Sequence, residues 1–148
     1  MKSVVVVQNF VTILFLFAAL VVLPAARADQ SNQATKVTFS QPVQIPGRVL
    51  PAGTYWFELP EDITQHYLVR IYSADRTVLY ATLFVASSER ATATDRTVFS
   101  LAERGSAQPQ AIVTWFYPGE TTGHQFRYPN QVEKELASAR LVNVVAGK

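Results

Sequence analysis

The chain has 148 residues, of which 49% are hydrophobic, 16% are charged and none is cysteine. This length suits one domain, and the lack of cysteine excludes disulfide bonds, thiol nucleophiles, cysteine-based zinc sites and lipid attachment through cysteine. The net charge is +2, but residues 29–148 carry 11 basic and 11 acidic side chains and are therefore neutral. A neutral domain without a basic run argues against binding to nucleic acid.

The first 28 residues have the pattern of a signal peptide. Lys2 gives a positive start, and residues 10–26 are almost purely apolar. Because Ala26-Arg27-Ala28 has small residues at both positions that cleavage requires, we predict a cut between Ala28 and Asp29. The alternative is an uncleaved anchor, since an apolar run of 17 residues lies at the lower limit for crossing a bilayer. We expect a bacterial protein that is secreted, to the periplasm or the extracellular space, with no membrane span after cleavage.

A polar leader and a first strand follow the signal peptide. Residues 29–35 are polar and aperiodic, and we predict that they are flexible. From Lys36 to Ser40, apolar and polar residues alternate as they do in a half-buried strand. Residues 41–51 contain three prolines. Proline cannot donate a hydrogen bond to a sheet, so this stretch is predicted to be an edge strand or an extended loop.

Further short strands are predicted up to residue 128. Val78–Ala86 is apolar on both faces, so we expect a central strand that is covered on both sides. The polar break at Ser73–Arg76 has the length of a hairpin turn. The spacing predicts an all-β fold, an antiparallel β-sandwich or barrel of six or seven strands. The expected strands are Lys36–Ser40, Thr54–Leu59, His66–Tyr72, Val78–Ala86, Thr97–Ala102, Ala111–Tyr117 and Gln125–Tyr128.

The hydrophobic period changes near the C-terminus. Asn130 and Glu133 have the spacing of a capping box, and apolar residues then recur at helical intervals as far as Val142. This pattern predicts one helix over residues 131–142. The expected organisation is a β-sandwich domain over residues 36–129, followed by a C-terminal helix and tail over residues 130–148.

Inward-facing apolar residues of the predicted strands should form one core. A strand that is covered on one side buries every second side chain. The residues expected to be mostly buried are Phe57, Ile71, Phe84, Phe99, Val113 and Phe116.

Several short motifs occur in a characteristic order along the mature chain. They are Leu50-Pro51-Ala52-Gly53-Thr54-Tyr55, Leu79-Tyr80-Ala81-Thr82, Trp115-Phe116-Tyr117-Pro118-Gly119, Gly123-His124-Gln125-Phe126 and Tyr128-Pro129. With these motifs, residues 37–129 resemble a group of small secreted uncharacterised proteins that are common in acidobacteria. The resemblance implies a secreted all-β domain. It implies no activity and no functional residues.

The sequence contains no recognisable catalytic motif. There is no G-x-S-x-G nucleophile elbow, and His66 and His124 are the only two histidines. Glu120 and His124 lie in or beside a predicted loop, where no helix would position them as a metal or catalytic pair. We therefore assign no catalytic residue, no metal ligand and no cofactor. The alternative is a hydrolytic enzyme with a loop-built site near Glu120 and His124, joined by His66 if distant loops meet.

A binding surface is the more plausible functional feature, and the aromatic residues indicate where it would lie. If Tyr55, Phe57 and Phe116 face the core, their strand neighbours face outwards. The residues of the expected outer platform are Trp56, Tyr72, Trp115 and Tyr117. An exposed aromatic platform is typical of a ligand or partner site. The alternative is that another segment covers this face, or that inside and outside are reversed. We expect a non-enzymatic structural or binding domain, with an envelope glycan or a protein as its partner.

Overall fold

The computed structural model describes residues 33–60 and 67–146. The predicted signal peptide (residues 1–28) and residues 29–32 of the predicted leader lie outside this part of the chain. Within it, the protein has ten strands and one short helix, which confirms the all-β fold class and exceeds the expected number of strands. No helix in the described residues is long and apolar enough to cross a membrane.

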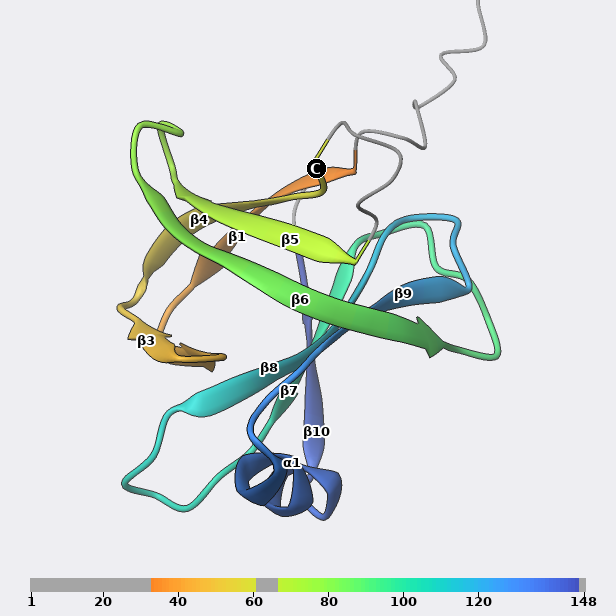
Figure 1. Ribbon diagram of the computed structural model, residues 1–148. Coiled ribbons are helices and arrows are strands. Elements are labelled where there is room, and N and C mark those ends of the chain that lie inside the picture. The colour runs from red at the N-terminus through yellow and green to blue at the C-terminus, as the bar shows by residue number, and fades with distance from the viewer. Residues whose placement is uncertain (1–32, 61–66, 147–148) are drawn as a thin grey trace, which may run out of the picture.

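The elements follow one another closely along the chain (Figure 1). The strands are β1 (Ala34–Phe39), β2 (Val43–Ile45), β3 (Arg48–Leu50), β4 (Gly53–Glu58), β5 (Leu68–Ser73), β6 (Leu79–Glu89), β7 (Val98–Ala102), β8 (Gln110–Phe116), β9 (Thr122–Phe126) and β10 (Leu141–Val145), and the helix is α1 (Asn130–Ala137).

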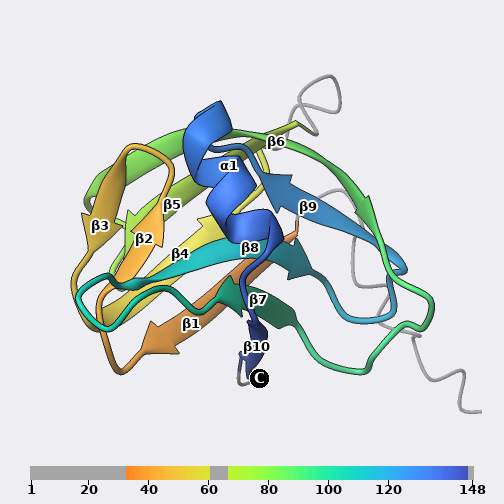
Figure 2. The ribbon, with the colours of Figure 1, turned by 90° about the horizontal axis from the view of Figure 1, so that it is seen from below.

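The strands form two layers that share the long strand β6. In the first layer, the order is β1-β4-β5-β6, and in the second layer it is β6-β9-β8, with β2 and β3 beyond β8. Strand β7 pairs with β8, and β10 pairs with β7. All these pairs are antiparallel except the short contact of β2 with β8, which is parallel. Helix α1 lies against the second layer, near β8 and β9 (Figure 2).

Aromatic side chains dominate the core between the two layers. Phe57 of β4, Phe99 of β7 and Trp115 of β8 are fully buried. The ring centroids of Phe57 and Phe99 are 4.9 Å apart, and those of Phe99 and Trp115 are 6.0 Å apart in a stacked arrangement. The predicted burial of Phe57, Ile71 and Phe99 is therefore confirmed. Val113 is only partly buried, although it packs against the core.

The expected burial of Phe84 is wrong. Strand β6 does lie in the middle of the strand order, between β5 and β9. However, 68% of Phe84 is exposed, and Leu79 on the same strand is half-exposed. Tyr67 is also exposed, and its ring stacks on that of Phe84 with the ring centroids 6.0 Å apart. The sequence pattern failed here because no described element covers the outer face of the first layer, so apolar residues on that face remain in solvent.

The face expected for Trp115 is also wrong, because β8 contains an irregularity. Ser100 pairs with Thr114 and the next residue of β7 pairs with Ile112, so Val113 is an extra residue in β8. Such a bulge reverses the alternation of faces along a strand. Ile112 and Trp115 consequently both face the core, and both are fully buried. Phe116 is buried as expected, but on the opposite face, under the guanidinium of Arg90, whose Cζ is 4.7 Å from the ring centroid.

The two ends of the domain are more ordered than the sequence suggested. Ala34 and Thr35 belong to β1, where they pair with β4, rather than to a flexible leader. At the other end, α1 stops at Ala137, and Val142 lies in β10 instead of in the helix. In β10, Val142 and Val144 lie on one face and are partly buried when the strand pairs with β7, and this pairing competes with helix formation. The predicted tail is therefore partly a strand of the second layer.

The start of α1 uses its predicted glutamate but not the predicted cap. Pro129 occupies the N-cap position, and no side chain caps the helix there. Glu133 still reaches back to the preceding segment, because its Oε1 accepts a hydrogen bond of 3.1 Å from the backbone N–H of Tyr128. The phenol of Tyr128 in turn donates to the backbone oxygen of Ile112 at 2.8 Å, and burial raises the pKa of that phenol. These bonds fasten the start of the helix to β8.

Candidate binding site

Trp56 stands on the outer face of the first layer, in the middle of β4. Its neighbours Tyr55 and Phe57 are buried, so the alternation along the strand turns the indole outwards, where it is half-buried. Across the strands, Trp56 pairs with Lys36 of β1 and with Tyr72 of β5. Two members of the predicted aromatic platform, Trp56 and Tyr72, are thus adjacent on the sheet.

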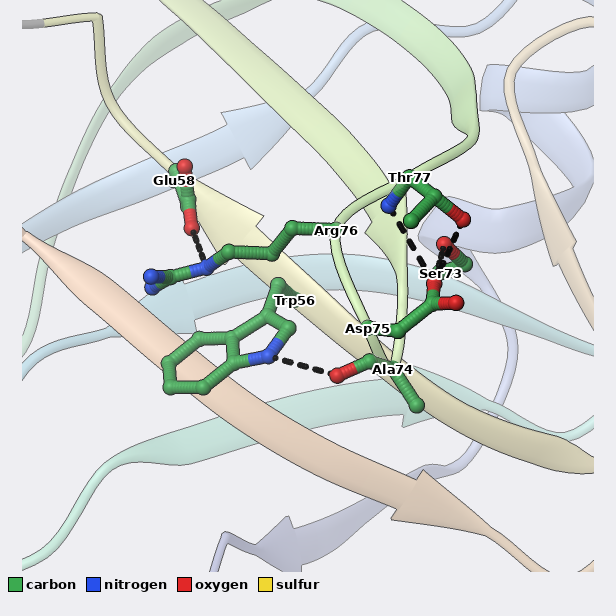
Figure 3. A network of polar contacts seen from close by, with 7 residues as sticks. All are labelled: Trp56, Glu58, Ser73, Ala74, Asp75, Arg76 and Thr77. Carbon is green, nitrogen blue, oxygen red and sulfur yellow. Dashed lines mark hydrogen bonds and ion pairs between the residues drawn. The ribbon is translucent and has the colours of Figure 1, made fainter.

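Arg76, in the middle of the β5–β6 turn, covers one face of the indole (Figure 3). Its Cζ lies 3.9 Å from the centroid of the Trp56 ring, and its Nε forms an ion pair of 2.6 Å with Oε1 of Glu58. The indole N–H donates to the backbone oxygen of Ala74 at 3.1 Å. From the neighbouring strand, Lys36 brings its Nζ to 5.9 Å from the same ring centroid. Two cations therefore flank one indole.

The turn that carries Arg76 is held together by a carboxylate. Oδ1 of Asp75 accepts hydrogen bonds from the hydroxyl of Ser73, from the hydroxyl of Thr77 at 2.8 Å and from the backbone N–H of Thr77 at 3.2 Å. These hydrogen bonds, led by the one from Ser73, lower the pKa of Asp75 to about 2. Arg76 itself has a φ of 61°, in the left-handed region that costs a residue with a side chain roughly 1–2 kcal/mol. The hydrogen bonds of the turn offset this local strain.

A cavity of about 250 Å³ borders Trp56. It lies where the start of β1, the segment before β7 and the end of β8 meet. Trp56 and Tyr117 contribute its aromatic lining, and Thr35 and Thr97 contribute buried hydroxyl groups. The complete lining is Ala34, Thr35, Lys36, Trp56, Asp95, Arg96, Thr97, Tyr117, Pro118 and Ala146.

Charged side chains also line this cavity. Lys36, Asp95 and Arg96 are exposed at its border, and none of the three forms an ion pair with another described residue. Arg76 and Glu58, which compensate each other, stand on the other side of Trp56. The site therefore combines aromatic surface, hydroxyl groups and both signs of charge, with cations in excess. Such a mixture suits recognition of a polar molecule better than of an apolar one.

The structure brings together three of the four predicted platform residues. Trp56 and Tyr72 are neighbours on the sheet, and Tyr117 lines the cavity with Trp56. Trp115 is excluded, because it is fully buried and cannot meet a ligand on the surface. Sequence reasoning did not identify the cations Lys36, Arg76 and Arg96 or the hydroxyl groups of Thr35 and Thr97 as parts of the site. Of these residues, only Lys36 could have been recognised from the sequence, since it lies on the outward face of a predicted strand.

Glu120 and His124 do not lie as the predicted alternative required. His124 is in β9, between β6 and β8, so it is neither in a loop nor at a sheet edge. Its ring centroid is 5.2 Å from that of Trp115, and its Nε2 is 3.1 Å from Oε1 of Gln33. The backbone oxygen of Glu120 accepts hydrogen bonds from Arg90 at 2.8 and 3.0 Å. His66 lies outside the described residues. Within those residues, no three histidine, aspartate or glutamate side chains are grouped to hold a metal ion.

Comparisons with known proteins add no assignment. No family model matches the chain, and no match was found among curated proteins or among solved structures.

Proposed function

We propose that residues 29–148 form an exported, non-enzymatic β-sandwich domain that binds an envelope glycan at the cavity beside Trp56. The observation that carries this proposal is the composition of the cavity lining, in which Trp56 and Tyr117 adjoin two buried threonine hydroxyls. Periplasmic or extracellular location follows from the predicted signal peptide.

A sugar ring has the two kinds of surface that this lining complements. Its C–H groups form apolar patches that pack on aromatic rings, and its hydroxyl groups both donate and accept hydrogen bonds. The cavity of about 250 Å³ is smaller than a typical pocket for a drug-sized ligand, so it suits one ring of a longer chain. The parts of Trp56 and Tyr72 that Arg76 leaves exposed would then support the neighbouring units of that chain.

The two threonines are the most informative polar groups of the cavity. The hydroxyls of Thr35 and Thr97 are 3.3 Å apart, and each residue is less than a tenth exposed. In this pair one hydroxyl donates to the other, and the second hydrogen has no acceptor among the described residues. A ligand oxygen in the cavity would accept that second hydrogen and extend the hydrogen-bonded pair to the ligand.

The proposal can be tested by binding measurements on the mature chain. The probes are peptidoglycan sacculi, in a co-sedimentation assay, and soluble neutral and acidic polysaccharides, in calorimetric titrations. We expect at least one probe to bind, and we expect Thr35→Val with Thr97→Val to weaken that binding by about tenfold or more, because a lost hydrogen bond of 1.4 kcal/mol corresponds to a factor of ten.

The matched control is Thr82→Val, at an exposed threonine of β6 that lies outside the cavity. This variant should bind as the unaltered chain does. A folded double variant with undiminished binding would contradict the assignment of the cavity. Failure of every glycan probe to bind the unaltered chain would contradict the function itself and favour a protein partner.

A further inference from the structure

We infer that the bound glycan is acidic, and that a sugar carboxylate is recognised by Arg76 and Lys36 beside Trp56. This inference rests on the proposed function and specifies the class of its ligand. The experiment below separates failure of the inference from failure of the function.

The cations around Trp56 are placed to meet one ligand. The guanidinium of Arg76 lies 3.9 Å from the centroid of the indole, and the Nζ of Lys36 lies 5.9 Å from it. Arg96 lines the adjoining cavity together with Lys36 and Trp56. A ligand that fills the cavity and extends across the indole would therefore meet Lys36 and Arg96 at the cavity and Arg76 beyond it, beside Trp56.

Arg76 retains free hydrogen-bonding capacity. Its ion pair with Glu58 uses Nε, at 2.6 Å from the carboxylate, and the two terminal nitrogens point away from Glu58 (Figure 3). No hydrogen bond or ion pair to another described residue uses these terminal nitrogens. A guanidinium with an open edge is well suited to a planar carboxylate, which it can bind through two parallel hydrogen bonds.

The backbone of Arg76 gives an independent reason to assign it a role in binding. Its φ of 61° lies where glycine, asparagine and aspartate are favoured, and an arginine there is strained. A glycine would complete the same turn without that cost. Strain of this kind is concentrated at functional sites, where the placement of the side chain compensates for it. In this turn, the strained backbone is what places the guanidinium over Trp56.

The site carries more positive than negative charge. The charge of Glu58 is compensated by its ion pair with Arg76, and Asp95 is the only acidic residue among those that line the cavity. These two carboxylates compare with three cationic side chains, those of Lys36, Arg76 and Arg96. The excess of positive charge favours an acidic sugar over a neutral one, while Asp95 can accept hydrogen bonds from sugar hydroxyls.

The test compares two ligands that share one sugar backbone, the free acid and its methyl ester, in which each carboxylate charge is replaced by a methyl ester group. Oligogalacturonate carries a free carboxylate on each sugar, and its methyl ester carries none. In calorimetric titrations of residues 29–148 at low salt, we expect the acid form to bind at least tenfold more tightly than the ester. This preference should decrease at high salt, because ions screen exposed charges.

Three variants locate the charge recognition. Arg76→Gly removes the guanidinium, and the relief of the strained backbone offsets part of the lost ion pair with Glu58 and of the lost contact with Trp56, so the variant should stay folded with a slightly lower melting temperature. It should lose most of the preference for the acid form, and Lys36→Gln should lose part of it. Arg76→Lys should keep less of the preference than its unchanged charge suggests, because an ammonium cannot bind both carboxylate oxygens in a planar fashion.

Two charge controls lie away from the site. Lys134 of α1 and Arg140 are exposed, so Lys134→Gln and Arg140→Gln should retain the full preference. Equal binding of acid and ester would overturn the inference and leave the glycan-binding function intact. A preference that survives in both Arg76→Gly and Lys36→Gln would overturn the assignment to these residues. Absence of binding to all glycans would overturn the function, and the inference with it.

Discussion

The two tryptophans of this chain have similar sequence surroundings and opposite environments. Trp56 in β4 lies between two aromatic residues, and Trp115 in β8 is followed by two more. Trp56 is half-buried on the outer face of the first layer, against the guanidinium of Arg76. Trp115 is fully buried between the layers, stacked on Phe99. In a run of consecutive aromatic residues, the neighbours of a tryptophan alone therefore do not show whether its side chain is buried or exposed.

The difference arises from the pairing of the two strands. Strand β4 pairs with β1 and with β5 without any register shift, so its alternation of faces is regular from end to end. Strand β8 carries an extra residue, Val113, opposite β7, so residues before and after Val113 alternate between the two faces in opposite order. The face of a side chain can therefore be counted from its neighbours along a strand only as far as the next bulge.

The largest expected effect is the contrast between the two tryptophans themselves. Trp115→Ala leaves a large cavity in the core, and we expect it to lower the free energy of unfolding by about 3–5 kcal/mol. Trp56→Ala should lower it by only about 1–2 kcal/mol, since it loses one hydrogen bond to Ala74 and the contact with Arg76. Urea denaturation monitored by circular dichroism measures both. Equal losses would break the comparison.

The close packing around Trp115 can be tested at Gly123 of β9. A methyl group there would stand 2.6 Å from the backbone oxygen of Trp115 and 2.7 Å from Cε1 of Phe116. Because backbone and a buried ring must both move, Gly123→Ala should destabilise the fold by about 1–3 kcal/mol. Gly105→Ala is the control, since no atom lies within 4 Å of its added methyl group, and its stability should stay within about 0.5 kcal/mol of the unaltered chain. If both variants are equally stable, the packing at β8 and β9 is looser than described.

The turn beside Trp56 should respond to acid. The pKa of Asp75 in the folded protein is lowered to about 2, below its ordinary value near 4. A lowered pKa means that the carboxylate stabilises the fold above the unfolded pKa, and that this contribution is lost as the pH falls from about 4 to 2. An NMR titration of the Asp75 side-chain carboxyl should show a midpoint near 2. In Asp75→Asn, the acid-induced fall in melting temperature over this range should be smaller. A midpoint near 4 would show that the hydrogen bonds from Ser73 and Thr77 do not hold the turn.

The smallest effect is expected at Phe84, on the same outer face as Trp56. Since 68% of this residue is exposed, Phe84→Ala should change the free energy of unfolding by no more than about 0.5 kcal/mol, apart from the loss of its stacking on Tyr67. Comparison with Trp115→Ala in the same urea series gives the scale. A loss above 2 kcal/mol would mean that the outer face of the first layer is covered.

Local patterns in the sequence were sufficient for several parts of the fold and of the site. The alternation in β4 predicted that Tyr55 and Phe57 share one face and Trp56 lies on the other, and Phe57 was expected to be buried, as the structure has them. The polar break at Ser73–Arg76 predicted the hairpin turn, and the three prolines at residues 41–51 predicted the sheet edge where β2 and β3 lie. These features depend on the period of the strand and on the chemistry of turns, both of which are carried by neighbouring residues.

Other features were decided only by contacts between distant segments. The bulge at Val113 is defined by the pairing of β8 with β7, and residues 141–145 form the strand β10 because they pair with β7. Phe84 is exposed because no described element packs on its face of the sheet. The site itself joins Thr35 with Thr97, and Trp56 with Arg76, across strands and turns that are separated along the chain. The sequence by itself determined which residues alternate, because the backbone fixes that period locally. The tertiary structure decided which of the two faces is covered and which side chains meet, because both depend on pairing between strands.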